Sequence, residues 1–414
     1  MVTSYDLSRN HINKELSKIL VLLVVSILVP GAGVIVNVLY LYTVKGLGHG
    51  LEKFVYFNIA LALGILAFSV HPGPIPGGDV YRYYLEMNQP HIRDLQRFAN
   101  REKNWMNITF YGLMRLIVVS SLPKNALSFI CIFVSYLCAM STLAEVRENK
   151  GFPYGKSAAI LIVLFFYVYS PYTLFSNYRN FLSVSLLSLA IMKATNNKKS
   201  AAFLLLVLGT ISHNGGWVIM TIYLISKLIT VPPRFNWIAV LVFLINERVS
   251  LFLIRFLSGA GFFPRYLNAL ATSYILGSKS SLFTSGSYGL IRYARAIVLL
   301  ITTLAVFVVV NRREKANEYL RFLSVYLFFL ISFANYRMVA ERFILLGIVL
   351  FLPLYYMFIT GHYPKSYKLL FIALMLANFD VFTFMDYGVR VGIGFPWNIF
   401  EPSVSLIKNY IIQF

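Results

Sequence analysis

The stretch NYRNFLSVSLLSLAIMKATNNKKSAAFLLLVLGTISHNGG, which runs from Asn177 to Gly216, shows the pattern that decides the fold. Two apolar runs, residues 180–195 and 201–213, are joined by a short turn that is rich in lysine and asparagine. Similar runs of leucine, isoleucine, valine and phenylalanine recur from residue 18 to about 384. They predict membrane-spanning helices, because a chain inside lipid must satisfy its own backbone hydrogen bonds, and they exclude the alternating pattern of a β-barrel.

The composition of the 414-residue chain fits no soluble class, because 58% of its residues are hydrophobic, 13% are charged and the mean hydropathy is +0.70. The net charge of +21 could indicate a nucleic-acid partner, but the 37 basic residues are scattered over short loops. A positive-inside bias and attraction to anionic lipids or to a pyrophosphate-bearing substrate explain the excess. We therefore predict an all-α polytopic membrane protein, with residues 1–414 as a single integral membrane domain and no nucleic-acid partner.

The apolar runs predict about 11 to 13 transmembrane helices. The expected segments are 18–43, 53–70, 126–145, 157–175, 180–195, 201–213, 216–231, 236–252, 290–310, 319–336, 341–360 and 367–384. If alternate connections are cytoplasmic, all the short basic connections fall on that side. Two segments fit poorly. Residues 105–122 are interpreted as a re-entrant or interface-lying helix with a snorkelling Arg115, and Pro30 makes the first segment either a kinked span or a hairpin.

A polar segment, HPGPIPGGDVYRYY at residues 71–84, interrupts the apolar pattern inside a predicted exterior loop over residues 71–125. Two glycines before Asp79 let the backbone turn sharply and approach a ligand closely. Tyr81 and Arg82 are candidate substrate-binding residues, because they offer an aromatic face and a guanidinium. Asp79 could take a proton from an attacking hydroxyl, or it could simply cap the helix that follows.

Several arginines stand at predicted exterior helix ends: Arg179, Arg292, Arg295, Arg337 and Arg342. A charged side chain near hydrocarbon is costly and usually turns toward protein or an aqueous cavity, where a guanidinium offers a planar donor fork to phosphate oxygens. All of these except Arg295 are candidate pyrophosphate ligands. The alternatives are an interface anchor, for Arg295 or Arg342, and a structural ion pair between Arg342 and Glu341.

His213 follows a short apolar run and precedes Asn-Gly-Gly, which predicts a helix broken inside the membrane around a water-filled cavity. It could donate to a substrate hydroxyl or phosphate, act as an acid or base, or be a structural donor. The exterior loop over residues 253–289 is either a cover or a plain connector. Cys131 and Cys138 share a helix face and are expected to pack, and we expect no metal and no cofactor, because the sequence has no motif for either.

Three motifs carry a resemblance to a known family. GGDVYRYY at residues 77–84, the central stretch quoted above and NYRMVAERFILLGIVLFLPL at residues 335–354 resemble those of the EpsG and Wzy-type bacterial polysaccharide polymerases. The resemblance implies a metal-independent, glycosyltransferase-C-like enzyme of the bacterial inner membrane. Such an enzyme joins undecaprenyl-pyrophosphate-linked oligosaccharides of an O-antigen or exopolysaccharide at the periplasmic face. The implied partners are these lipid-linked oligosaccharides, membrane lipids, a chain-length regulator and a flippase.

The resemblance also implies roles for individual residues. Asp79 matches the acid of the first exterior loop, Arg179 and His213 match the central arginine and histidine, and Arg337 matches the late arginine, for which Arg342 is the alternative. In this hypothesis Asp79 orients or deprotonates the acceptor, the arginines neutralise the departing pyrophosphate, and His213 holds it or positions the acceptor. A membrane transferase of single sugars, a flippase or transporter of lipid-linked sugar, and an acyltransferase are the alternative functions.

Overall fold

In a computed structural model, the chain is built from helices, and no β-strand occurs in the part described. That part comprises residues 4–44, 47–69, 79–150, 155–229, 231–232, 238–244, 286–315, 317–334, 336, 339–378 and 402–404. Its elements are α1 (Ser4–Leu28), α2 (Pro30–Thr43), α3 (His49–Phe68), α4 (Asp79–Met87), α5 (Pro90–Arg93), α6 (Leu95–Ala99), α7 (Glu102–Met106), α8 (Ile108–Val119), α9 (Asn125–Lys150), α10 (Lys156–Val168), α11 (Pro171–Ser176), α12 (Tyr178–Thr195), α13 (Lys199–Thr210), α14 (Asn214–Leu228), α17 (Gly286–Arg313), α18 (Glu318–Ser332), η3 (Val339–Leu345), α19 (Ile348–Thr360) and α20 (Lys365–Leu376).

Three of the described helices are long and apolar enough to cross a membrane: Gly50–Phe68, Asn125–Glu148 and Tyr293–Arg313. Shorter apolar helices, such as α2, α10, α13 and α19, accompany them. The predicted all-α membrane architecture is therefore confirmed. The predicted number of transmembrane helices stays a prediction, because it includes apolar segments whose helices are shorter than these three.

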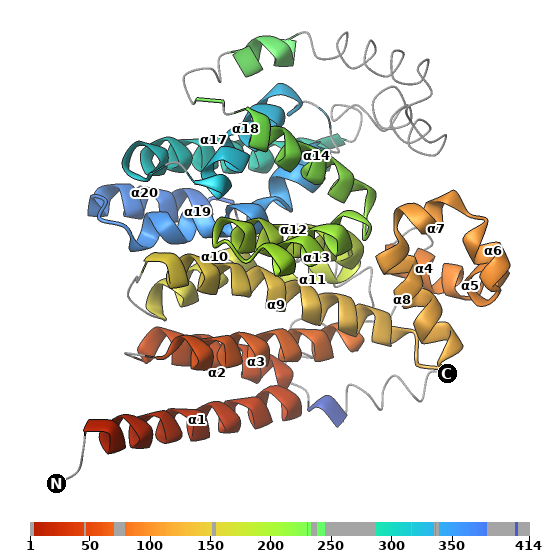
Figure 1. The fold of residues 1–414 in the computed structure, drawn as a ribbon, viewed down its shortest axis with the longest axis horizontal. Helices are drawn as coiled ribbons and strands as arrows, with labels where there is room; N and C mark the ends of the chain where they lie inside the picture. Colours follow the sequence, from red (N-terminus) through yellow and green to blue (C-terminus); the bar gives the residue numbers. More distant parts are fainter. Residues whose placement is uncertain are drawn as a thin grey trace.

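The long helices pack in stacked rows with α12 at the centre (Figure 1). α3 packs on α2 and α9, α9 packs on α12, and α12 also contacts α13, α14, α18 and α19. All the residues of α12 from Phe181 to Met192 are buried, as expected for a helix that is apolar on every side. Small residues allow the neighbouring helices to approach closely, and the Ser183 hydroxyl donates to the Gly209 carbonyl of α13 at 2.7 Å.

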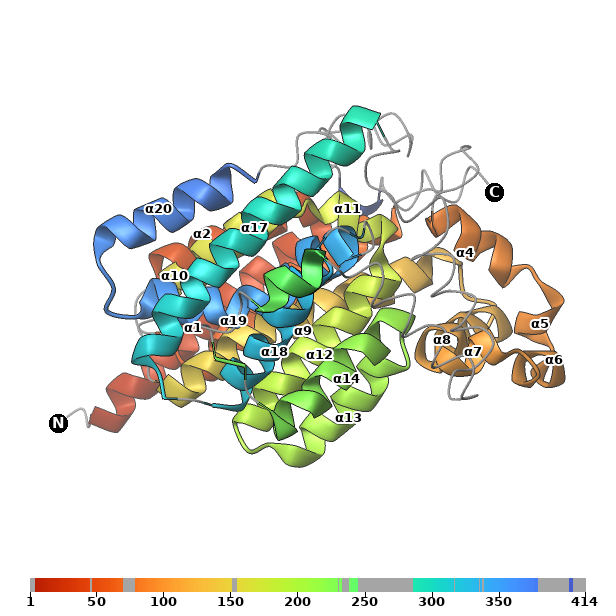
Figure 2. The same ribbon diagram turned by 90° about the horizontal axis from the view of Figure 1, so that it is seen from above.

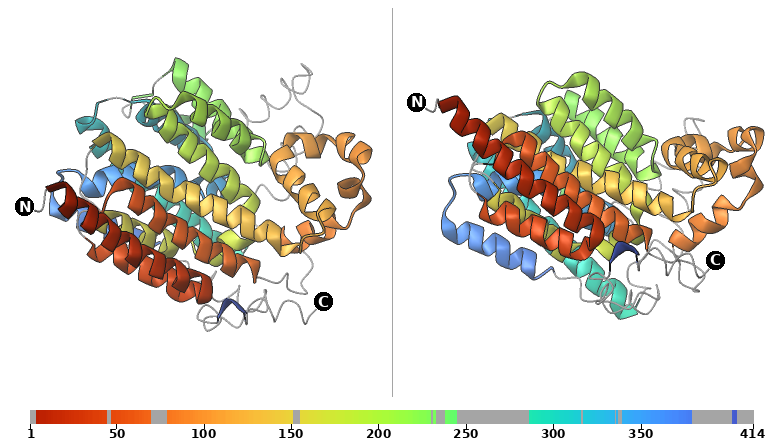
Figure 3. Two further views of the ribbon diagram at one scale, coloured as in Figure 1. Left: turned by 60° about the horizontal axis from the view of Figure 1, so that its bottom comes forward. Right: turned by 90° about the horizontal axis from the view of Figure 1, so that it is seen from below.

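The first apolar segment is a helical hairpin. Its second helix begins at Pro30, whose ring suits the first turn of a helix. A Cβ atom at Gly33 would lie 2.4 Å from the Cα of Ser26, so only glycine fits where the two helices meet. Farther along the pair, the Tyr40 hydroxyl of α2 donates to the Glu15 carboxylate of α1. The structure thus selects the hairpin over the kinked span, and α1 lies along the outside of the bundle (Figure 3).

A proline inside α19 is stabilised by two neighbouring helices. Pro353 cannot donate to the carbonyl four residues earlier, and the Ser188 hydroxyl of α12 donates to that carbonyl at 3.0 Å. One residue further, the Tyr319 hydroxyl of α18 donates to the Leu350 carbonyl at 2.8 Å and accepts from the Leu354 N–H at 3.0 Å. These side-chain bonds join three backbone groups of α19 to its two neighbours. Contacts from α12 and α18 therefore determine the path of α19.

Helices α4 to α8 form a lobe at one end of the bundle (Figure 2). Within it, α8 has 12 residues and is about 18 Å long, too short to cross roughly 30 Å of hydrocarbon. The Nη1 of Arg115 donates to the carbonyls of Ile92 and Arg93 at 2.8 and 2.6 Å, and its snorkelling stays a prediction. The Thr109 N–H donates to the Ile211 carbonyl at 3.2 Å and ties the lobe to the end of α13.

Basic connections lie at the other end of the bundle. α9 begins at Asn125, beside the lobe, and Glu145 lies about 30 Å further along this helix. There the Glu145 carboxylate, which is 1% exposed, accepts from Lys193 in the last turn of α12 and from Lys198 just before α13, at 2.5 and 3.0 Å. The separation of these lysines from the lobe agrees with the predicted topology, and the assignment of this end to the cytoplasm stays a prediction.

Candidate active site

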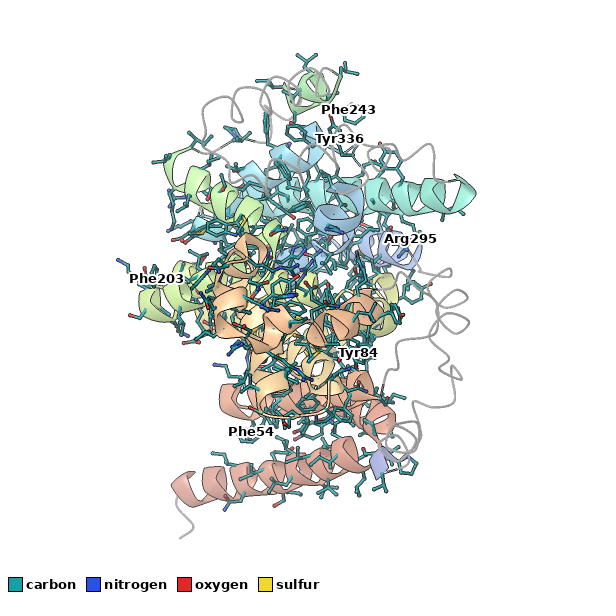
Figure 4. The ribbon with its side chains drawn as sticks, turned by 90° about the vertical axis from the view of Figure 1, so that its right-hand side faces the viewer. Phe54, Tyr84, Phe203, Phe243, Arg295 and Tyr336 are labelled. Carbon is teal, nitrogen blue, oxygen red and sulfur yellow. The ribbon has the colours of Figure 1, made fainter. Side chains whose placement is uncertain are left out.

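Residues with predicted chemical roles come together at the lobe end of the bundle, where α4, α8, α12, α14 and η3 meet. Figure 4 looks onto this end, with the lobe in front of the bundle. The Tyr84 hydroxyl of α4, labelled there, donates to the Asn125 side chain at the start of α9. The Asn125 amide in turn donates to the Phe68 carbonyl at the end of α3 at 2.6 Å. These bonds fix the first helix of the lobe to the ends of two long helices.

Arg179, the second residue of α12, is held by aromatic side chains of the lobe. Its guanidinium carbon lies 5.4 Å from the ring centroids of both Tyr83 and Phe110, within the range of a cation–π contact. Its Nη1 donates to the Tyr111 hydroxyl at 3.4 Å. The Tyr83 ring also packs against Tyr178, with a centroid separation of 5.2 Å. We call Tyr83, Phe110 and Tyr178 the aromatic shelf, and it supports the arginine at the start of a buried helix.

Positive charge converges on Tyr83. Burial raises the pKa of its phenol, and the charge of Arg179, followed by those of Arg82 and Arg342, acts in the opposite direction. Since one hydroxyl feels all three guanidinium groups, α4, α12 and η3 bring their arginines to a common region. Arg82 is exposed, whereas Arg179 and Arg342 are partly buried. A cluster of this kind attracts a multiply charged anion.

His213 lies in the turn between α13 and α14, beyond the end of the apolar helix Lys199–Thr210 and outside the three long apolar helices. Its Nδ1 accepts a hydrogen bond from the Gly215 N–H at 3.0 Å, which makes it the N-cap of α14. Burial lowers the pKa of His213 well below its ordinary value, and the charges of Arg179 and Arg342 lower it further. The imidazole is therefore neutral near pH 7, and because Nδ1 is an acceptor, the proton resides on Nε2. This arrangement favours a donor role over that of a general base.

Arg342 lies in η3, a π-helix that packs against α17 and α18. π-Helical turns are rare and occur frequently at functional sites. The Tyr326 hydroxyl of α18 donates to the carbonyl of Phe343 at 2.8 Å. The Phe343 ring reaches the His213 turn, because a Cβ atom at Gly215 would lie 3.6 Å from it. The π-helix thus rests against the N-terminus of α14.

Some predicted site residues lie partly or wholly outside the described structure. Asp79 is the first residue of α4, in the position from which it was expected to act or to cap, but its side chain is outside the described part. The same holds for the side chain of Arg292 in α17 and for the whole of Arg337. Tyr81 is partly buried in α4. The predicted cover loop lies outside the described residues except for its last part, residues 286–289, which begins α17.

Arg295 is not an interface anchor, so that alternative is wrong. The side chain is 8% exposed, and its Nη2 donates to the carbonyls of Val168 and Asn378 at 2.7 and 2.9 Å. These carbonyls stand at the C-terminal ends of α10 and α20, where a cation also interacts favourably with the helix dipole. Arg295 therefore joins three helices and has a structural role.

Three residues that surround Arg179, namely Phe110, Tyr111 and Glu86, are not among the sequence-predicted site residues. The Tyr111 hydroxyl accepts from Arg179 and donates to Glu86 Oε2 at 3.2 Å. The sequence signal that could have found Glu86 is the helical spacing of α4, which places positions 79, 83 and 86 on the same face. The apolar pattern around Phe110 and Tyr111 predicts a helix at the membrane interface, away from any site.

Residues 54–392 match the model of the EpsG family, and this match covers most of the chain. The chain belongs to the EpsG family. The predicted resemblance is thereby confirmed, and it places the chain among polysaccharide polymerase-like membrane proteins with glycosyltransferase-like activity. Neither the curated proteins nor the solved structures include a match to it. Every element of the candidate site lies within the matched residues.

In this EpsG-family chain, the site combines two features that favour anions. The N-termini of α12 and α14 lie at the lobe end, and backbone N–H groups at helix N-termini bind phosphate and carboxylate groups. Arg82, Arg179 and Arg342 add full positive charges to the same region. Within the described ranges, no group of three or more histidine, cysteine, aspartate or glutamate residues is placed to hold a metal ion. The helix N-termini and the arginines can together bind an anion and stabilise its charge.

Proposed function

We propose that the chain is a polymerase that joins oligosaccharide repeat units carried on undecaprenyl pyrophosphate, at the periplasmic face of the bacterial inner membrane. One geometric observation carries this proposal: Arg179, at the start of α12, lies over the ring of Tyr83, which follows Arg82 in α4. In agreement, the charges of Arg179, Arg82 and Arg342 all act to lower the pKa of the Tyr83 phenol. Pyrophosphate fits such a cluster, because it carries several negative charges in a small volume and its oxygens match the guanidinium fork. The surrounding apolar helices suit a polyprenyl chain.

The proposed reaction is a glycosyl transfer. A hydroxyl oxygen of the acceptor unit attacks the anomeric carbon of the donor unit and forms the new glycosidic bond. The carbon–oxygen bond to pyrophosphate breaks, and the electron pair leaves with the polyprenyl pyrophosphate. Asp79 is our candidate for the base that receives the hydroxyl proton. Arg82, Arg179 and Arg342 stabilise the charge on the leaving group, and His213 donates to it or to the acceptor.

Deletion of the gene, followed by gel analysis of the surface polysaccharide, tests the function. A polymerase predicts loss of the long ladder with single repeat units retained. An unchanged chain length with one missing side sugar would instead establish a transferase of single sugars. Accumulation of lipid-linked units at the cytoplasmic face would establish a flippase.

Complementation of the deletion strain with variants tests the site. Arg179→Ala should reduce polymer by about a hundredfold, the usual loss when a group that stabilises developing charge is removed. Arg313→Ala is a matched control, because Arg313 also lies over an aromatic ring, at 5.1 Å from the Tyr363 centroid, but at the basic end. It should restore the full ladder. A full ladder from Arg179→Ala at normal abundance would contradict the proposed site, and the same result from Asp79→Asn would remove Asp79 from the mechanism.

A further inference from the structure

A continuous set of hydrogen bonds links the lobe to Arg179. Arg179 Nη1 donates to the Tyr111 hydroxyl oxygen at 3.4 Å, and the same hydroxyl donates its proton to Glu86 Oε2 at 3.2 Å. The Tyr111 hydroxyl accepts one hydrogen bond through its oxygen and donates the other through its proton, so it can make both bonds at once. Tyr111 is fully buried. On the far side of the carboxylate, Glu86 Oε1 lies 3.7 Å from His91 Nε2.

These bonds restrict a rotation of the Arg179 guanidinium that contact with the aromatic shelf does not prevent. The rings of Tyr83 and Phe110 fix how far the guanidinium of Arg179 stands from the lobe, since its carbon is 5.4 Å from each centroid. Contact with a ring face still allows a flat group to rotate. A hydrogen bond from one guanidinium nitrogen to Tyr111 sets that rotation and therefore the direction in which the other nitrogens point.

Orientation matters for the proposed chemistry. A guanidinium binds two phosphate oxygens well only when its donor fork faces them. An arginine that is already oriented before the substrate arrives loses less conformational freedom on binding. It also does not have to reorient while charge develops on the leaving group.

We propose that Tyr111 and Glu86 are positioning residues, which orient Arg179 toward the pyrophosphate of the lipid-linked donor. Glu86 acts through Tyr111: its carboxylate holds the hydroxyl proton, and the hydroxyl oxygen is thereby turned toward Arg179. This inference rests on the proposed function for the identity of the substrate. It assigns roles to two residues outside the motifs that define the site in the sequence.

Tyr111→Phe is the principal test, because it removes one oxygen atom and keeps the ring. The assay uses the purified protein in lipid nanodiscs, with lipid-linked repeat units extracted from the deletion strain. We expect kcat to fall about tenfold, the effect of losing one hydrogen bond to a charged group, with a smaller change in KM. Affinity for inorganic pyrophosphate, measured by calorimetry, should fall by a similar factor.

Tyr223→Phe is the matched control. Tyr223 is a buried tyrosine whose hydroxyl also donates to a carboxylate, that of Glu318, beside the cation of Lys227. This group joins α14 to α18 near the basic end, so its loss should leave kcat and pyrophosphate affinity unchanged. Equal losses in the two variants would show that Tyr111 has only a structural role and would overturn the proposal.

A double-mutant cycle separates positioning from general damage. If Tyr111 acts through Arg179, then Tyr111→Phe added to Arg179→Lys should lower kcat by less than about twofold further, because the residues form one unit. Losses that multiply would refute the link. Glu86→Gln keeps an acceptor for the hydroxyl without the charge and should give a loss of about threefold. If Tyr111→Phe does not fold, an unchanged kcat in Glu86→Gln overturns the proposal.

The two readouts separate this inference from the proposed function. Polymer made by the wild-type protein, with no effect of Tyr111→Phe on kcat or on pyrophosphate affinity, would leave the function standing and end the inference. If the wild-type protein makes no polymer but Tyr111→Phe weakens pyrophosphate binding, the inference holds and the proposed reaction is wrong. If the wild-type protein neither makes polymer nor binds pyrophosphate, both are wrong.

Discussion

His213→Asn should remove one pH-dependent contribution to the stability of the protein. Asparagine caps a helix as well as any residue, so the bond from the Gly215 N–H can be kept without an imidazole. In the wild-type protein, burial and then the charges of Arg179 and Arg342 hold the pKa of His213 well below its ordinary value. The unfolded chain therefore binds a proton near pH 6.5, whereas the folded chain does not. Stability from this residue is present above that pH and is lost as the pH falls toward the folded pKa.

The size of the effect follows from the same difference. Each pH unit between the two pKa values changes the free energy of unfolding by about 1.4 kcal/mol. Lowering the pH from 7.5 to 5.0 takes the solution about 1.5 units below the unfolded pKa, so His213 should account for a loss of at most about 2 kcal/mol. The asparagine variant should lose less stability over this range, by up to that amount.

Unfolding in mixed detergent micelles, measured at both pH values, provides the assay. His362→Asn is the matched control for the change of residue type, because it replaces an exposed histidine away from the candidate site. Parallel losses in the wild-type protein and His213→Asn would refute the reasoning. Activity gives a second readout: the variant should be impaired at pH 7.5, because it lacks the Nε2 donor.

Three further predictions concern packing and ion pairs. Gly216→Ala should lower the free energy of unfolding by about 1–3 kcal/mol, because the new Cβ would lie 2.7 Å from the Gly209 carbonyl oxygen of α13 and from the Ser183 hydroxyl of α12. An unchanged melting temperature would contradict this. Glu145→Gln should lower the free energy of unfolding by about 1–3 kcal/mol, because the Glu145 carboxylate accepts from two lysines. Unfolding measured at low and high salt should show a smaller difference between variant and wild type as the salt concentration rises. Tyr319→Phe should lower the free energy of unfolding by about 1–3 kcal/mol, because the Leu350 carbonyl and the Leu354 N–H of α19 lose a hydrogen-bond partner. Equal unfolding curves would show that these two backbone groups pair with each other instead.

Several features of the fold can be predicted because their signals lie close together in the sequence. Arg179 is expected at a helix start, and it is the second residue of α12. The Asn-Gly-Gly that follows His213 predicts a break there, and the residue is the N-cap of α14. Pro30 shows the limit of such signals. A proline after an apolar run is compatible with a bend or with a hairpin, and tertiary contacts such as those of Gly33 with Ser26 and of Tyr40 with Glu15 distinguish them.

Other features depend on contacts between residues far apart in the chain. Ser188 and Tyr319 hold α19 by hydrogen bonds to its backbone, and neither position reveals this in the sequence. Arg295 resembles the arginines at exterior helix ends, yet it binds helix carbonyls, because the distinction depends on which helix ends lie nearby. The π-helix around Arg342 has no sequence signal, since the apolar pattern there fits an ordinary helix.

The sequence by itself determined that this is a helical membrane protein, where the basic turns and polar breaks fall, and which family motifs it carries. Hydrophobicity and charge set these features because each depends on the transfer of short segments between water and lipid. Tertiary structure alone decided that Arg179 stands on the aromatic shelf and bonds to Tyr111, which in turn bonds to Glu86. Tyr111 and Glu86 are 25 residues apart and Arg179 follows 68 residues later, so their meeting depends on how the lobe packs against the bundle.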